Sequence, residues 1–119
     1  MSQMGFDTAS AVIAPAGSLS ASCALGAGRV RGIIVPAGWL AAALTFQVSI
    51  DGTNYFELID DRTGFYSAST GFAVAAGQYL AIDPVLFDGV ALIKVRSGTL
   101  ASPVVQTGGA TLTVALRIV

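Results

Sequence analysis

A strict alternation of apolar and polar residues in the middle of the chain constrains its fold most. Within residues 44–50 every second residue is apolar: Leu44, Phe46, Val48 and Ile50. A period of two places these side chains on one face of a β-strand and the intervening Thr45, Gln47 and Ser49 on the other. Asp51 and Gly52 then supply residues that tolerate a turn, and residues 55–58 are typical of a returning strand. The segment predicts a β-hairpin with one apolar and one polar face.

The rest of the chain predicts further short strands separated by turns. Period-two patterns recur at residues 78–82, 92–97 and 110–119. Between them, Asp83 and Pro84 favour a helical turn, because aspartate caps a helix and proline fits its first position. We therefore predict an all-β fold, a single antiparallel β-sandwich with jelly-roll-like topology and one short helical turn near residues 84–87. We expect residues 1–10 to form a flexible N-terminal arm and residues 11–119 to form the β-sandwich domain.

The balance of apolar and charged residues points to an assembly. Of the 119 residues, 54% are hydrophobic and only 11% are charged, whereas globular chains carry about 25% charged residues. So few charges cover a folded surface poorly, and large exposed apolar areas usually mark an interface. The composition predicts a subunit of a larger assembly that forms a homo-oligomer.

The charges also argue against two classes of partner. The net charge is −1, and the only lysine is Lys94. Nucleic acids and anionic membrane surfaces attract clustered cations, and the sequence shows no such cluster. The two long uncharged stretches, residues 8–28 and 32–50, are interrupted by Gly, Pro and alternating polar residues. We expect neither a nucleic-acid partner nor a membrane partner.

The residue types that carry most enzyme chemistry are scarce. The chain has no histidine, and its one cysteine, Cys23, cannot form an intrachain disulfide. A lone cysteine is more often a small buried apolar residue than a nucleophile. We expect no catalytic activity and no cofactor.

One group of oxygen-bearing residues suits a cation. The turn residues Asp51 and Asn54, together with Asp60 and Asp61, could supply ligands for Ca²⁺. Aspartate beside glycine or aspartate is also the ordinary composition of a turn, and this interpretation is favoured. We predict no metal site.

Three segments together resemble a group of small virion proteins of tailed bacteriophages. They are VSIDGTNY at residues 48–55, GQYLAIDP at 77–84 and IKVRSGT at 93–99. The same pattern is distantly similar to galactose-binding, discoidin-type jelly rolls, although the chain lacks the disulfide pair of that family. Its sugar-binding residues cannot be matched to this sequence one by one.

The phage resemblance implies a capsid decoration (cement) subunit that binds and stabilises the shell of major capsid protein, often as a trimer. Such a protein would be assembled in the host cytoplasm and would lie on the capsid surface of the virion.

The alternative is a carbohydrate-binding module of a phage head or tail fibre, because sugars stack on exposed aromatic rings beside amides. The candidate residues for that alternative are Trp39, Asn54, Tyr55, Tyr66 and Gln106. For Trp39, a place in the core is favoured over an exposed position.

Overall fold

The computed structural model describes residues 5–60 and 66–118. This part of the chain contains eight β-strands and one 3-10 turn, joined by loops. The elements are β1 (Phe6–Ile13), β2 (Cys23–Ala24), β3 (Arg29–Ile34), β4 (Leu44–Ser49), β5 (Phe56–Glu57), β6 (Tyr79–Ala81), η1 (Pro84–Phe87), β7 (Leu92–Ser97) and β8 (Ala110–Arg117). Asp83 caps η1 by accepting a hydrogen bond from the Val85 N–H, as the sequence predicts.

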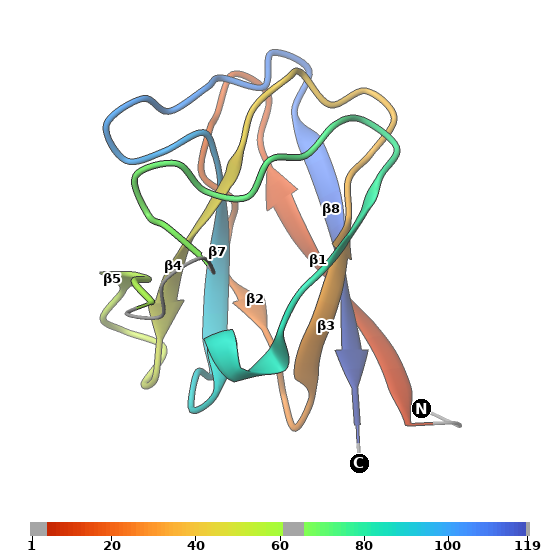
Figure 1. The fold of residues 1–119 in the computed structure, drawn as a ribbon, viewed down its shortest axis with the longest axis vertical. Coiled ribbons are helices and arrows are strands. Elements are labelled where there is room, and N and C mark those ends of the chain that lie inside the picture. Colours follow the sequence, from red (N-terminus) through yellow and green to blue (C-terminus); the bar gives the residue numbers. More distant parts are fainter. Residues whose placement is uncertain (1–4, 61–65, 119) are drawn as a thin grey trace.

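The strands form two four-stranded antiparallel sheets that pack face to face (Figure 1). One sheet has the order β1-β8-β3-β6 and the other has the order β2-β7-β4-β5. Strand β1 pairs with β8, β2 with β7, β3 with β6 and β4 with β5. This is the strand order of an eight-stranded jelly roll, so the predicted all-β sandwich is confirmed.

Apolar side chains from the inner faces of both sheets form the core. Phe46 lies at its centre, and its ring contacts those of Tyr66, Phe72 and Phe87 at centroid separations of 5.8, 6.1 and 5.1 Å. Across from it, the first sheet contributes Ile33, Leu112 and Val114, which are fully buried. The alternation that predicted the strands is therefore the pattern that fills the core.

Two details of the sequence prediction are wrong. β4 ends at Ser49, so Ile50 leaves the sheet and is 72% exposed instead of joining the apolar face. Residues 6–10, expected in the flexible arm, form the first part of β1 and pair with β8 from Phe6↔Arg117 onward. These residues show no clear apolar–polar alternation, and their partner strand lies at the other end of the sequence. Residues 1–4 of the expected arm lie outside the described residues.

Within residues 5–60 and 66–118, no helix has the length and apolar character needed to cross a membrane.

Candidate functional site

The five residues considered for sugar binding do not converge on one surface. Trp39 and Gln106 lie in the loops that follow β3 and β7, whereas Asn54 and Tyr55 lie in the β4–β5 loop at the opposite end of the sandwich (Figure 1). Trp39, Tyr66 and Gln106 are buried, with exposed fractions of 5%, 4% and 0%. A buried ring cannot stack on a sugar and a buried amide cannot reach one, so three of the five candidates are misplaced for that role.

Gln106 joins two loops at one end of the molecule. Its Oε1 accepts a hydrogen bond from the Leu40 N–H, and its Nε2 donates to the Leu40 carbonyl and to Ser97 Oγ, each at 2.9 Å. Trp39 lies beside this clamp and donates from Nε1 to the Ala42 carbonyl at 3.2 Å. Both side chains are committed to holding loops together, and the predicted place of Trp39 in the core is confirmed.

Tyr66 is part of the aromatic core. Its hydroxyl accepts a hydrogen bond from the Phe46 N–H at 3.3 Å, and its ring lies 5.1 Å from that of Phe72. Burial raises the pKa of Tyr66 to about 12, because the ionised phenolate would be poorly solvated there. The side chain stabilises the interior and offers no group to a ligand.

Asn54 and Tyr55 are already bound within the chain. Asn54 donates from its backbone N–H and from Nδ2 to the Asp51 carboxylate, both at 2.9 Å. Tyr55 shares a 2.6 Å hydrogen bond with Ser22, and the Lys94 ammonium lies 4.4 Å from the centre of its ring. These contacts tie the β4–β5 loop to the sheet, and Lys94 occupies one face of the Tyr55 ring.

Arg96 and Glu57 form a bidentate ion pair on the second sheet. Two guanidinium nitrogens meet the two carboxylate oxygens at 2.6 Å, and Gln47 donates to the same carboxylate at 2.9 Å. The Arg96 hydrogen bonds lower the pKa of Glu57, and the Glu57 carboxylate in turn raises the pKa of Arg96. A carboxylate held ionised in a bidentate pair is poorly suited to general acid catalysis.

The cation site considered from the sequence has a structural explanation. One Asp51 carboxylate oxygen accepts the backbone N–H groups of Thr53 and Asn54, each at 2.9 Å. These bonds lower the pKa of Asp51 and close the turn. Asp61 lies outside the described residues, and no cluster of three metal-binding side chains occurs among those described.

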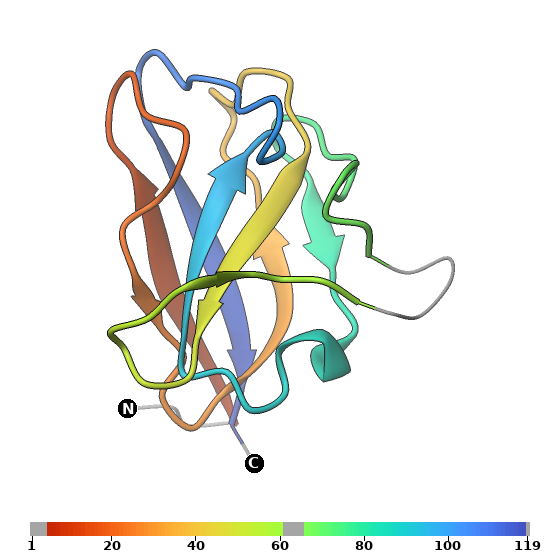
Figure 2. The same cartoon turned by 90° about the vertical axis from the view of Figure 1, so that its left-hand side faces the viewer.

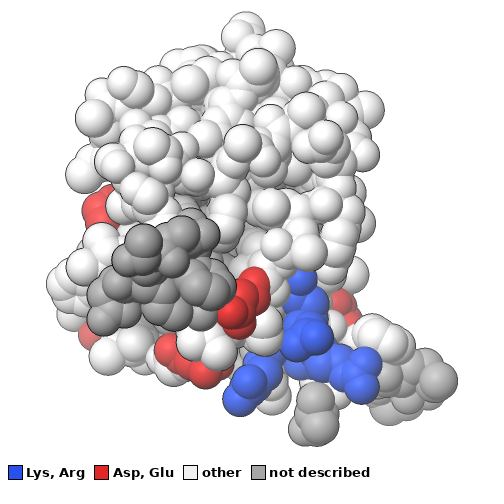
Figure 3. All heavy atoms as spheres, viewed as in Figure 1, with Lys and Arg blue, Asp and Glu red and all other residues white. Residues whose placement is uncertain are grey.

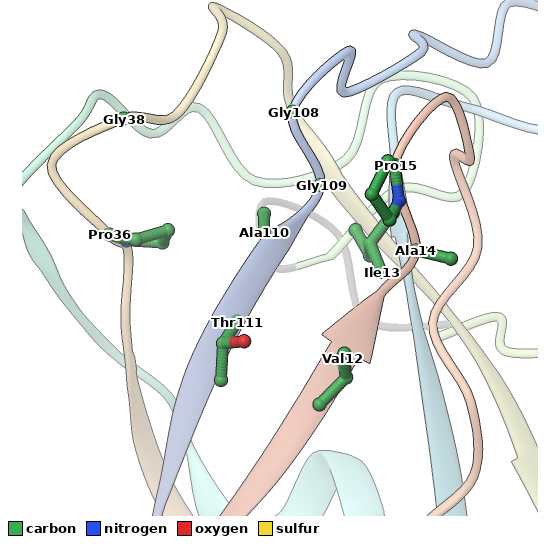
Figure 4. A pocket seen from close by; sticks show the side chains of 10 residues that line it. All are labelled: Val12, Ile13, Ala14, Pro15, Pro36, Gly38, Gly108, Gly109, Ala110 and Thr111. Atoms are coloured by element: carbon green, nitrogen blue, oxygen red, sulfur yellow. The ribbon is translucent and has the colours of Figure 1, made fainter.

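Two shallow hollows open at the surface. The first, of about 380 Å³, lies where β1 ends and β8 begins, between Pro15 and Pro36, with Gly108 and Gly109 beside them (Figure 4). The second, of about 560 Å³, lies between Ile59, Ser69 and Leu100. Neither brings a set of convergent polar groups together, so neither has the features of a specific small-molecule site.

A third surface feature is the outward face of the first sheet, which we call the open face. Its residues follow from the alternation and register of the four strands: Phe6, Thr8, Ser10, Val12, Arg29, Arg31, Gly32, Ile34, Tyr79, Ala81, Thr111, Thr113, Ala115 and Arg117. Small residues dominate its middle, and four large apolar side chains (Phe6, Val12, Ile34 and Tyr79) are 45–59% exposed. Ile34 and Tyr79 are direct neighbours in the register, and Phe6 and Val12 lie at the two ends of β1 on the same face.

Sequence reasoning located β8 of this face but missed the first half of β1 and the face itself. The available signal was the small, weakly polar character of the outward positions in residues 8–12 and 111–117. That signal becomes informative only once β1, β8 and β3 are known to be neighbours.

The chain matches no protein-family model, no curated protein and no solved structure.

Proposed function

We propose that this protein is a structural virion protein of a tailed bacteriophage, a decoration subunit that binds the shell of major capsid protein and self-associates, with a trimer favoured. The resemblance of three sequence segments to phage virion proteins supplies the biological setting. The jelly-roll strand order suits it, since this architecture is common in capsid proteins.

The open face is the observation that carries the proposal. An antiparallel sheet with one face in water normally places polar residues on that face and apolar residues on the face in the core. Here only one end of the face is charged, and the remaining outward positions are Ala, Gly, Ser, Thr or apolar residues. A flat surface of small residues allows another protein to approach the sheet closely, and its burial is a favourable source of association energy.

Copy number on purified particles tests the proposed role directly. A decoration subunit should be present at on the order of one copy per capsid protein, because it follows the symmetry of the shell. Quantitative gel densitometry of particles measures this ratio. A yield of only a few copies per particle would reject the decoration role.

A substitution in the open face links that role to the surface. Ile34→Lys places a charge in the middle of the face, whereas Val105→Lys changes a similarly exposed residue in the β7–β8 loop; the two side chains are 45% and 50% exposed. We expect Ile34→Lys to reduce shell occupancy and to shift the protein toward the monomer in light scattering. Val105→Lys should behave as the wild type, and equal behaviour of the two variants would exclude the open face from the interface.

A further inference from the structure

Half of the cations in the chain gather at one end of the open face. In the strand register, Arg117 of β8 lies directly between Phe6 of β1 and Arg29 of β3. The Arg117 guanidinium lies 5.1 Å from the centre of the Phe6 ring, and Arg29 reaches Asp88 at 3.8 Å. Figure 3 shows the basic side chains of this side collected near the two chain ends.

A β-bulge adds a third arginine to this group. The register of β3 against β8 shifts between Val30 and Gly32, so Arg31 has no residue directly opposite it. A bulge turns the extra side chain away from the regular alternation, and Arg31 is exposed beside Arg29. We call Phe6, Arg29, Arg31 and Arg117 the arginine row.

Within residues 5–60 and 66–118, two of the three arginines of the row, Arg31 and Arg117, form no ion pair. In that part of the chain, the Arg29–Asp88 contact is the only ion pair that any of its three guanidinium groups forms. Like charges directly opposite on neighbouring strands are destabilising, so the Arg29–Arg117 pair works against the fold. Two of the six basic residues of the chain thus lie directly opposite each other, and a third is exposed close by.

From this geometry we infer that the arginine row binds carboxylates on an acidic surface of a neighbouring protein. The neighbour is the shell protein if the proposed function holds, and the charge argument does not depend on that identity. A guanidinium donates two parallel hydrogen bonds to the two oxygens of a carboxylate, and a carboxylate between Arg29 and Arg117 would offset their repulsion.

The chemistry of the row favours a protein over a nucleic acid. Arginine and aromatic residues are enriched at the centres of protein–protein interfaces. Here Arg117 lies beside Phe6, whose side chain is 59% exposed. Binding along a phosphate backbone requires an extended series of cations, whereas this row is short and belongs to a chain of net charge −1. The row also continues directly into the open face, which can supply the apolar part of the same interface.

Binding to empty shells is the first test. The double variant Arg31→Glu, Arg117→Glu reverses two exposed charges without altering the core, and Lys94→Glu reverses a charge on the other sheet as the matched control. In co-sedimentation at about 50 mM NaCl, we expect the double variant to bind at least about tenfold more weakly than wild type and the control to stay within about twofold. Wild-type binding should also weaken at about 300 mM NaCl. Unchanged binding of a folded double variant would overturn the inference.

The second test uses the isolated protein, so that the two proposals can fail separately. Hexaglutamate is titrated into ¹⁵N-labelled wild type and double variant, with an inorganic polyphosphate as the competing chemistry. We expect hexaglutamate to shift the amide signals of the arginine row in wild type only. Shifts without shell binding would retain the acidic-surface inference and reject the capsid role. No localised shift, or stronger localised shifts with polyphosphate, would reject the carboxylate assignment.

Discussion

The charged side chains on the outward faces of the two sheets differ in burial and in pairing. On the β2-β7-β4-β5 sheet, the segment that carries β5 crosses in front of β4 and β7 (Figure 2), and we call this side the covered face. Beneath that segment Arg96 is only 5% exposed and is paired with Glu57. On the open face, Arg29 and Arg117 lie opposite each other and exposed. On the covered face a buried arginine is paired with a carboxylate of the same sheet. On the open face two arginines lie side by side at the surface.

The same contrast extends to the uncharged residues. On the covered face, Thr45 and Ser49 are fully buried, and Thr45 Oγ1 donates to the Gly98 carbonyl at 2.6 Å. On the open face, the corresponding outward positions of β8 include Thr111, which is exposed, and Thr113, which is half-buried. The hydroxyl groups of similar residues are therefore buried on the covered face, whereas on the open face they are accessible to solvent or to a partner. Substitutions in the covered face should affect stability, and those in the open face should affect association.

The largest effect is expected from removing the cation of the covered face. Arg96→Met keeps much of the side-chain volume but leaves Glu57 without its bidentate partner. Removing one member of a buried pair costs about 3–5 kcal/mol, and we expect about 2–4 kcal/mol here because the Glu57 side chain is 27% exposed. Urea unfolding followed by circular dichroism measures the loss.

Lys94→Met is the matched control for that variant, since Lys94 lies on the same strand but stacks on Tyr55 at the surface. Its cost should stay below about 1 kcal/mol. Equal losses in the two variants would mean that the Arg96 ion pair adds nothing beyond a surface contact.

A smaller effect is expected where the open face depends on a glycine. The Tyr79 ring lies against the position that a Gly32 Cβ would occupy, and the Leu80 carbonyl oxygen would be 2.7 Å from it. Gly32→Ala should therefore destabilise the protein by about 1–3 kcal/mol and displace the ring. Thermal unfolding and the Tyr79 ring signals in NMR measure both changes.

Gly38→Ala is the control, because nothing lies within 4 Å of its added Cβ and its φ is not positive. It should change stability by less than about 0.5 kcal/mol. If Gly32→Ala changed stability as little as Gly38→Ala, the Tyr79 ring could not be packed against Gly32.

Acid should weaken the covered face selectively. The folded-state pKa of Glu57 lies below its ordinary value of 4.5, so the stability from its pairing is present above about pH 4.5 and is lost as pH falls through the folded pKa. The difference in unfolding free energy between wild type and Arg96→Met should therefore shrink below about pH 4.5. Urea titrations at several pH values test this, and a constant difference would contradict the ionised pair.

The sequence predicted the strands well because their period is local. The Leu44–Ser49 strand, the Asp83 cap and the alternation in β8 each depend on near neighbours along the chain. It failed at Thr45, Ser49 and Arg96, which looked like solvent-facing residues and are buried. Thr45 contacts Gly98, Ser49 the Asp51–Gly52 turn and Arg96 the β5 residue Glu57. No local pattern in the sequence encodes these contacts.

The candidate site was harder to predict for the same reason. Arg29 and Arg117 become neighbours only through the pairing of β3 with β8, two segments far apart in sequence. The five sugar-binding candidates were chosen by residue type, and Tyr66 and Trp39 instead pack in the interior. Aromatic and amide residues serve both cores and sites, so their type does not decide between the two without burial.

The smallest effect separates the two faces most directly. If the arginine row is kept for a partner, replacing Arg117 should not destabilise the free protein, unlike the replacement of Arg96. Arg117→Glu places a carboxylate opposite Arg29 and should be more stable than Arg117→Gln by about 0.2–1 kcal/mol at low salt. The difference should fade at high salt because both groups are exposed. Both variants should lie within about 0.5 kcal/mol of wild type, since the lost contact with Phe6 offsets the relieved repulsion. A wild type that exceeded both by about 2 kcal/mol or more would show that Arg117, like Arg96, serves the fold itself.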